Sequence, residues 1–218
     1  MNIKTDHLSL AREVIGLMWD EMESTEGVYT FAVGGESGSG KTTLSLAIKS
    51  ALGERGMQSF IFHMDDYFYL PPGDTYNKRL RDISTVGPGE VNMELLQEHL
   101  DSVRSGVSLL KKPLVSYREN QIYEVIAETE NTEVIIAEGT YALLLNNIDC
   151  RIFMQRNYME TYENRVMRAR DPVIPFYEKV LEIEHNIVKE HAELADILID
   201  KNYNVKVKSE EYKESDYS

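Results

Sequence analysis

The segment from Gly35 to Thr43 combines the residue types and spacing that hold the phosphates of a nucleotide. Its sequence, GESGSGKTT, contains the pattern G-x-x-x-x-G-K-[ST]. Glycines let such a loop turn its backbone N–H groups towards phosphate oxygens. The alternative is a glycine-rich turn without a ligand, but the pattern rarely arises by chance and it lies after a predicted strand and before a predicted helix, as a phosphate loop does. We therefore expect a site for ATP and Mg²⁺, with contacts from Gly35, Ser37, Gly38, Ser39, Gly40, Lys41, Thr42 and Thr43.

Within this loop two side chains would do most of the chemistry. Lys41 would reach the β- and γ-phosphates, and the hydroxyl of Thr42 would bind Mg²⁺. The N-K-x-D pattern expected of a GTPase is absent from the sequence. The modest length of 218 residues favours a kinase for small molecules over a large motor ATPase.

Acidic residues follow two segments that read as strands. Asp65 and Asp66 come directly after residues 58–63, and Glu138 comes directly after residues 133–137. A carboxylate at Asp65 could accept the proton of an attacking hydroxyl, although an Asp here could equally cap a turn. Glu138 stands where nucleotide-binding folds place a second acidic contact to Mg²⁺; a turn acid beside Gly139 is the alternative.

Three arginines lie close together on a predicted helix over residues 158–170: Arg165, Arg168 and Arg170. They could clamp phosphates and stabilise charge during transfer, or they could pair with Glu160 or Glu163 on the helix surface. Basic residues also cluster at 78–81 and 111–112, which is notable in an acidic chain.

Strands and helices alternate along the sequence, which predicts an α/β fold with a mostly parallel sheet covered on both faces. Residues 64–90 read mostly as loop, and residues 203–207 as an extra strand. We expect one domain over residues 1–208, with an appended helix at 8–22 and an acidic, disordered tail at 209–218. The predicted strands are 28–33, 58–63, 133–137, 149–154 and 196–199, and the predicted helices are 44–55, 91–104, 158–170 and 175–192.

Charge and cysteine content exclude several classes of partner. The net charge of −14, from 23 basic and 37 acidic residues, argues against nucleic acid and anionic membranes. A single cysteine, Cys150, permits no internal disulfide. Neither a signal peptide nor a bilayer-spanning run is recognisable, so we expect a cytoplasmic protein with a small-molecule substrate. The oligomeric state cannot be read from the sequence.

Together these segments resemble the uridine kinase and phosphoribulokinase family of P-loop kinases. The resemblance implies a P-loop NTPase fold with a central five-stranded parallel sheet, flanking helices and a small helical lid. It also implies ATP·Mg²⁺ as donor, Asp65 as general base, Glu138 near the metal, and lid arginines over the phosphates. The matching segments are 35–43, 64–68, Pro88 with the helix after it, 138–143, 165–171 and 194–199.

The acceptor side departs from this family. Val86 stands where uridine kinases carry a sugar-binding acid, and their P-V-Y-D-F segment becomes PLVSY at residues 113–117, which loses both the Tyr and the Asp. A site that loses such polar groups cannot keep the same selectivity. We expect an ATP-dependent kinase for a hydroxyl of a small metabolite, uridine kinase-like but not uridine-specific. The expected catalytic residues are Lys41, Asp65 and Arg168, and the expected acceptor contacts are Asp66, Tyr67, Tyr117 and Arg168.

A different class of function remains open at this point. The altered acceptor segments and the 13 tyrosines would also suit a nucleotide-binding regulator, or a toxin-like effector that acts on a protein partner. Turnover of ATP with a metabolite separates the two hypotheses.

Overall fold

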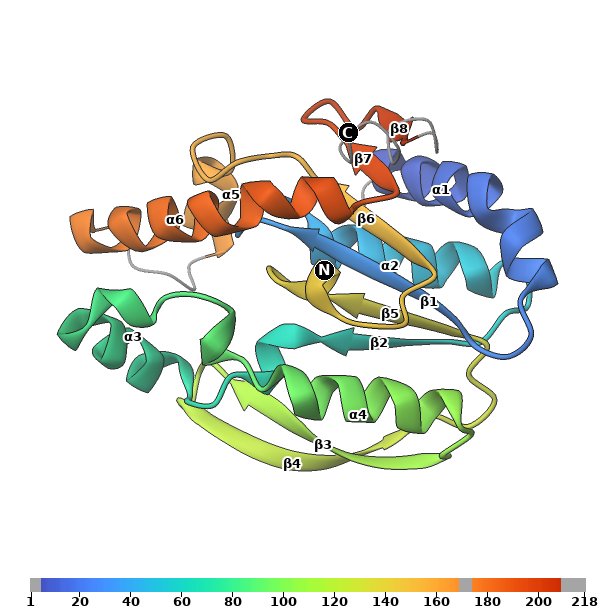
Figure 1. Cartoon of the computed structure of the whole chain (residues 1–218), viewed down its shortest axis with the longest axis horizontal. Helices are drawn as coiled ribbons and strands as arrows, with labels where there is room; N and C mark the ends of the chain where they lie inside the picture. The colour runs from blue at the N-terminus through green and yellow to red at the C-terminus, as the bar shows by residue number, and fades with distance from the viewer. Residues whose placement is uncertain (1–4, 169–173, 209–218) are drawn as a thin grey trace, which may run out of the picture.

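A six-stranded sheet lies at the centre of the computed structural model, which describes residues 5–168 and 174–208 (Figure 1). Five neighbouring strands are parallel, and the sixth, β8, runs antiparallel to β7. Across the sheet the strands are β2 (Ser59–His63), β5 (Val134–Glu138), β1 (Tyr29–Gly35), β6 (Cys150–Met154), β7 (Ile197–Ile199) and β8 (Val205–Val207). The predicted α/β fold with a five-stranded parallel sheet is confirmed, and β8 corresponds to the extra strand predicted from residue 203.

Helices pack on both faces of this sheet. One core cluster contains residues of α1, α2 and the sheet, and the other contains residues of α4, of α6 and of the opposite sheet face. The helices are α1 (Thr5–Ser24), α2 (Lys41–Gly53), α3 (Pro72–Arg81), α4 (Met93–Arg104), α5 (Tyr162–Arg168) and α6 (Pro175–Val188). Short 3₁₀ turns are η1 (Met64–Tyr67), η2 (Ile83–Thr85), η3 (Pro88–Glu90), η4 (Ala142–Leu144) and η5 (Lys189–Leu194).

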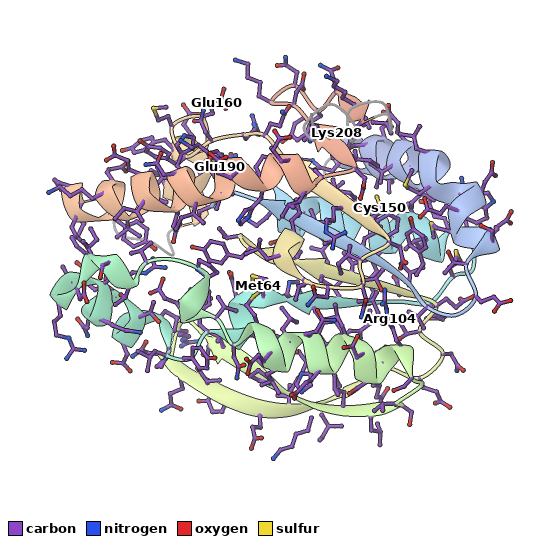
Figure 2. The ribbon with its side chains drawn as sticks, in the orientation of Figure 1. Met64, Arg104, Cys150, Glu160, Glu190 and Lys208 are labelled. Atoms are coloured by element: carbon purple, nitrogen blue, oxygen red, sulfur yellow. The ribbon has the colours of Figure 1, made fainter. Side chains whose placement is uncertain are left out.

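Strand β1 shows how the sequence produces two cores. Its side chains alternate between the faces, so Phe31 and Val33 join the α1–α2 cluster while Ala32 joins the other. All three are fully buried. Such uninterrupted apolar runs are typical of a parallel strand covered on both sides. Cys150, at the start of β6, is also buried in this layer (Figure 2).

Two elements that the sequence did not predict lie beside the sheet. The predicted loop at 64–90 contains α3, and a hairpin of β3 (Leu109–Ser116) and β4 (Gln121–Glu128) fills a stretch with no prediction. The sequence pattern does not predict α3, because this helix is mostly polar and has no apolar periodicity. The hairpin has exposed apolar residues on a two-stranded ribbon, which blurs the alternation of a half-buried strand.

Helix ends differ from the predictions by a few residues. The predicted helix at 175–192 ends at Val188 and continues as the 3₁₀ turn η5. Of the predicted 158–170 helix, residues 158–161 form a turn and residues 162–168 form α5. Residues 169–173 and the predicted tail at 209–218 lie outside the described residues. None of the helices described has the length and apolar character needed to cross a membrane.

Candidate active site

The loop between β1 and α2 adopts a backbone that only glycine accommodates well. Gly35, Gly38 and Gly40 have φ angles of 139°, 78° and 107°. A Cβ atom at Gly35 would also come within 2.8 Å of the main-chain oxygen of Met154. Helix α2 begins at Lys41, directly after the last of these glycines, so its first N–H groups face the loop.

The structure brings together the two residues that the sequence suggested for Mg²⁺. Thr42 Oγ1 donates a hydrogen bond to Glu138 Oε1 at 3.0 Å. His63 Nδ1 lies 2.7 Å from the same oxygen, and because a carboxylate only accepts, this nitrogen carries the hydrogen. Lys41 Nζ donates to the main-chain oxygen of Glu36 at 2.9 Å. Three parallel strands and the start of α2 thus deliver these groups to one edge of the sheet.

This cluster keeps Glu138 ionised although it is buried. Burial alone would raise the pKa of the carboxyl, but the hydrogen bond from His63, the charges of Lys41 and His63 and the hydrogen bond from Thr42 together lower it. The same hydrogen bond from His63 to Glu138 raises the pKa of His63, against the opposing effect of burial. The result is a compact group of hard oxygen atoms beside the phosphate loop.

Asp65, the expected general base, lies in the 3₁₀ turn that follows β2. Its carboxylate faces a cavity and accepts a hydrogen bond from the Tyr117 hydroxyl at 3.2 Å. Tyr117 follows β3 in the hairpin and is 39% exposed. These two residues are distant in sequence, and the structure places them together at the cavity.

Asp66 and Tyr67, by contrast, do not line this cavity. Asp66 is 7% exposed, binds Lys112 Nζ at 2.8 Å and accepts a hydrogen bond from the Val115 N–H at 3.0 Å. Tyr67 is buried, with its hydroxyl 2.8 Å from His99 Nδ1. The structure therefore gives both residues a structural role in place of the expected substrate contact, because adjacent residues in a 3₁₀ turn point in different directions.

A cavity of about 560 Å³ extends from Asp65 and Ser37 towards α3 and α6. Its walls come from η1, α3, the hairpin and α6, and α3 and α6 lie at the same end of the molecule in Figure 1. The lining combines aromatic and aliphatic side chains with a similar number of polar and charged ones. The lining includes Phe68, Leu70, Tyr76, Arg79, Val115, Tyr117, Arg118, Asn120, Thr140, Tyr177, Leu181 and Glu184.

One buried ion-pair network contributes to the cavity wall. Arg79 of α3 binds Glu90 through two nitrogens, with distances of 2.9 Å and 2.8 Å, and binds Glu184 of α6 at 3.1 Å. The Arg79 side chain is only 7% exposed. Sequence reasoning noted the basic cluster at 78–81 but missed its role, because the two glutamates are separated from it by 11 and 105 residues.

The turn before α5 and α5 itself, where the lid is expected, contact the phosphate loop. Thr161 Oγ1 donates to the Ser37 carbonyl at 2.8 Å, and Asn164 Nδ2 donates to the Gly38 carbonyl at 3.2 Å. A Cβ atom at Gly38 would approach the Cγ of Arg165 to 2.9 Å. Helix α5 therefore requires glycine at this loop position for steric as well as conformational reasons.

Of the three arginines expected in the lid, Arg165 is the one whose side chain the structure describes. Its side chain is buried; Nη2 donates to the Tyr158 carbonyl at 3.1 Å and lies 3.6 Å from Glu178. Arg168 is the last residue of α5, and its side chain lies outside the description, as does the whole of Arg170. Arg165 is thus positioned over Gly38 and paired with protein groups.

Comparison with known proteins identifies the family. The model of the phosphoribulokinase / uridine kinase family matches residues 30–160, which is more than half of the chain and includes the phosphate loop, Asp65 and Glu138. The chain belongs to this family. Its P-loop fold and its membership agree with the resemblance drawn from the motifs.

Curated relatives of this chain carry the names of three different kinases. A bifunctional alpha-galactosidase/sucrose kinase of Mediterraneibacter gnavus is 23% identical over 84% of this chain. A phosphoribulokinase of Synechocystis is 27% identical over 53% of the chain, and a uridine kinase of Ligilactobacillus salivarius 26% identical over 77%. The match spans 21%, 33% and 82% of these three relatives, so the chain corresponds to a small part of the first two.

Solved structures of family members and other kinases share the fold. Phosphoribulokinase from Rhodobacter spheroides superimposes with a TM-score of 0.62 at 10% identity, covering 81% of this chain and 71% of that one. D-glycerate 3-kinase from Cryptococcus neoformans gives a TM-score of 0.60 at 12% identity, covering 91% and 99%. At such low identity these likenesses concern the fold alone.

Proposed function

We propose that this family member is an ATP-dependent kinase that transfers the γ-phosphate of ATP to a hydroxyl of a small metabolite and is not specific for uridine. One observation carries the proposal. The phosphate loop, through Ser37, and the candidate base Asp65 line the same cavity of about 560 Å³. A cavity of that volume is large enough to hold a small metabolite against both groups.

The residues present suit ATP and Mg²⁺. The hydroxyl of Ser39 is buried in the glycine loop without a hydrogen-bond partner, as suits a loop that accepts a polar ligand. Thr42 and Glu138 supply adjacent hard oxygens, the ligand type that Mg²⁺ prefers. Among the described residues no three His, Cys, Asp or Glu side chains form a metal cluster, which fits an ion held largely by phosphates and water. When bound, Mg²⁺ would neutralise charge on the β- and γ-phosphates.

In this proposal each side chain has a defined task. Asp65 accepts the proton as the acceptor hydroxyl oxygen attacks the γ-phosphorus. The bond from that phosphorus to the β–γ bridging oxygen breaks, and ADP leaves. Lys41 moves from the Glu36 carbonyl to the phosphates, where its charge stabilises the transferring group. Arg168 and Arg170, expected in the lid, would add positive charge near the phosphates, and Arg165 would do so on leaving the Tyr158 carbonyl and Glu178.

The polar groups around the cavity suit a polyhydroxyl acceptor, and the lining carries charges of both signs, from Asp65, Glu184, Arg79 and Arg118. Arg79 is already paired with Glu90 and Glu184, so its charge is not available for a phosphate ester. Asp65 and Glu184 both face the cavity and can accept hydrogen bonds from hydroxyls. The acid of uridine kinases is replaced by Val86, which is 6% exposed and offers no polar group.

A turnover assay with a metabolite panel tests the proposal. ADP release from ATP·Mg²⁺ would be measured with sugars, polyols, nucleosides, hydroxy acids and sugar phosphates, and we expect stimulation by a polyhydroxyl compound. Asp65→Asn should then lower kcat by about 10²- to 10⁴-fold with little change in the Kd for ADP. Asp20→Asn, an exposed acid of α1, is the matched control and should be unaffected.

Two outcomes would contradict the proposal. Normal turnover by the Asp65→Asn protein would remove the base assignment. Nucleotide binding without turnover across the whole panel would favour the alternative of a nucleotide-binding regulator or toxin-like effector that acts on a protein partner.

A further inference from the structure

The phosphate loop contains one acidic side chain whose position needs an explanation. Glu36 follows Gly35 directly, and a carboxylate in a loop that receives polyphosphate is electrostatically unfavourable. Glu36 is nevertheless only 6% exposed, and both of its carboxylate oxygens are engaged. It therefore has a role that outweighs this cost.

Its two oxygens reach two different parts of the chain. Oε2 accepts a hydrogen bond from the Tyr158 main-chain N–H at 2.6 Å, at the approach to the lid helix α5. Oε1 lies 2.7 Å from His185 Nδ1 on α6, and this nitrogen carries the hydrogen because the carboxylate only accepts. The His185 ring also packs against the Tyr158 ring, with centroids 5.7 Å apart. Glu36 thus connects the phosphate loop to the lid approach and to α6.

Helix α6 is at the same time a wall of the acceptor cavity. Tyr177, Leu181 and Glu184 line the cavity at spacings of four and three, so they share one face of the helix. His185 lies four residues after Leu181, beside that face, and contacts the phosphate loop. A shift of Glu36 would therefore change the position of the residues that surround the acceptor.

We propose that Glu36 and His185 are positioning residues that couple the phosphate loop to α6, so that nucleotide binding orders the acceptor cavity. The inference rests on the proposed kinase function. Phosphates that hold the loop and draw Lys41 away from the Glu36 carbonyl also set the orientation of the Glu36 side chain. Through His185 this orientation reaches α6, and by reciprocity an acceptor against α6 strengthens nucleotide binding.

Hydrogen exchange with MgADP as the probe tests the coupling without a known acceptor. In the wild-type protein, MgADP should slow amide exchange in peptides from the phosphate loop and also from 175–188. In His185→Ala the loop should remain protected, while the protection of 175–188 by MgADP is lost. His185→Asn, whose amide can replace the Nδ1 donor, should restore it. Glu182→Ala, an exposed residue of the same helix, should behave as wild type.

Steady-state kinetics provide a second measurement, because a purely structural role of His185 would not change the acceptor KM selectively. With an acceptor from the panel, His185→Ala should raise the acceptor KM by a factor in the range of about 5 to 150 and leave the Kd of MgADP within about threefold of wild type. A raised acceptor KM with an unchanged Kd of MgADP indicates lost coupling, because general unfolding would weaken the binding of both ligands.

The outcomes separate this inference from the function on which it rests. If MgADP binds but does not alter exchange in 175–188, or if His185→Ala keeps that protection, the coupling is refuted and the kinase proposal stands. If MgADP does not bind the wild-type protein, the proposed function fails and the inference fails with it.

Discussion

Replacement of Asp66 by Asn should destabilise the protein strongly, because it leaves a buried lysine without its counter-charge. The side chains of Asp66 and Lys112 are 9% and 7% exposed, and their charged atoms are 2.8 Å apart. The Asn oxygen can still accept from the Val115 N–H, and Lys112 keeps its hydrogen bond to the Pro113 carbonyl at 2.8 Å. What is lost is the carboxylate charge and the hydrogen bond that Lys112 Nζ donates to Oδ2, because the amide NH2 of Asn takes the place of that oxygen and cannot accept.

The expected cost follows from the burial of this pair. Removing one partner of a buried ion pair typically costs about 3–5 kcal/mol. For a chain of this size, each kcal/mol corresponds to a fall in Tm of roughly 2–4 °C. Replacing both partners with uncharged groups removes the unpaired charge. The double variant Asp66→Asn/Lys112→Met should therefore recover most of the loss.

Urea unfolding followed by far-UV circular dichroism measures these differences. Lys111→Met is the matched control, since Lys111 pairs with Glu124 at the surface, with side chains 62% and 68% exposed. An exposed pair of this kind contributes at most about 1 kcal/mol. A loss below about 1 kcal/mol in Asp66→Asn, or a double variant no more stable than the single one, would refute the reasoning.

Three further predictions concern the sheet edge and the core. Thr42→Val should remove the Mg²⁺-dependent part of ADP affinity, measured by calorimetry with and without Mg²⁺; an unchanged Mg²⁺ effect would exclude Thr42 as a ligand. Gly139→Ala should cost about 1–3 kcal/mol in urea unfolding, since its Cβ would overlap the side chain of Met64, labelled in Figure 2; wild-type stability would contradict that packing. Burial, assisted by the charge of Lys112, lowers the pKa of His99 from 6.5. Below pH 6.5 the unfolded chain therefore binds a proton that the folded protein excludes, so the free energy of unfolding decreases as the pH is lowered. His99→Asn should reduce that slope by up to about 1.4 kcal/mol per pH unit, and equal slopes would contradict the assignment.

The parallel sheet was predictable because local patterns specify it. Apolar runs such as 133–137 read as buried strands wherever they occur, and helices between them require parallel crossovers. Helix α3 and the β3–β4 hairpin were not predictable in this way. Helix α3 is stabilised by Arg79, which pairs with glutamates far away in the sequence, and the hairpin is held against η1 by the Lys112–Asp66 pair. Long-range pairs of this kind leave no periodicity in the sequence.

The candidate site also has one part that could be predicted from the sequence, the phosphate loop, and one part that could not, the acceptor side. The phosphate loop could be recognised because its function depends on consecutive backbone groups and on two adjacent side chains, Lys41 and Thr42. The roles of Lys41, Asp65, Glu138 and the lid arginines stay predictions for the assays above. Which of two adjacent aspartates faces the cavity depends on the 3₁₀ turn; the resemblance to the family pointed to Asp65 as the base, but the burial of Asp66 against Lys112 could not be read from the sequence.

By itself, then, the sequence determined the family, the parallel sheet and the nucleotide loop, all of which depend on residues close together in the chain. Only the tertiary structure decided what surrounds the acceptor. It placed Tyr117 beside Asp65, paired Arg79 with Glu184, and joined Glu36 to His185 over a separation of 149 residues. The physical reason is that these contacts form only when distant segments pack against the same end of the sheet.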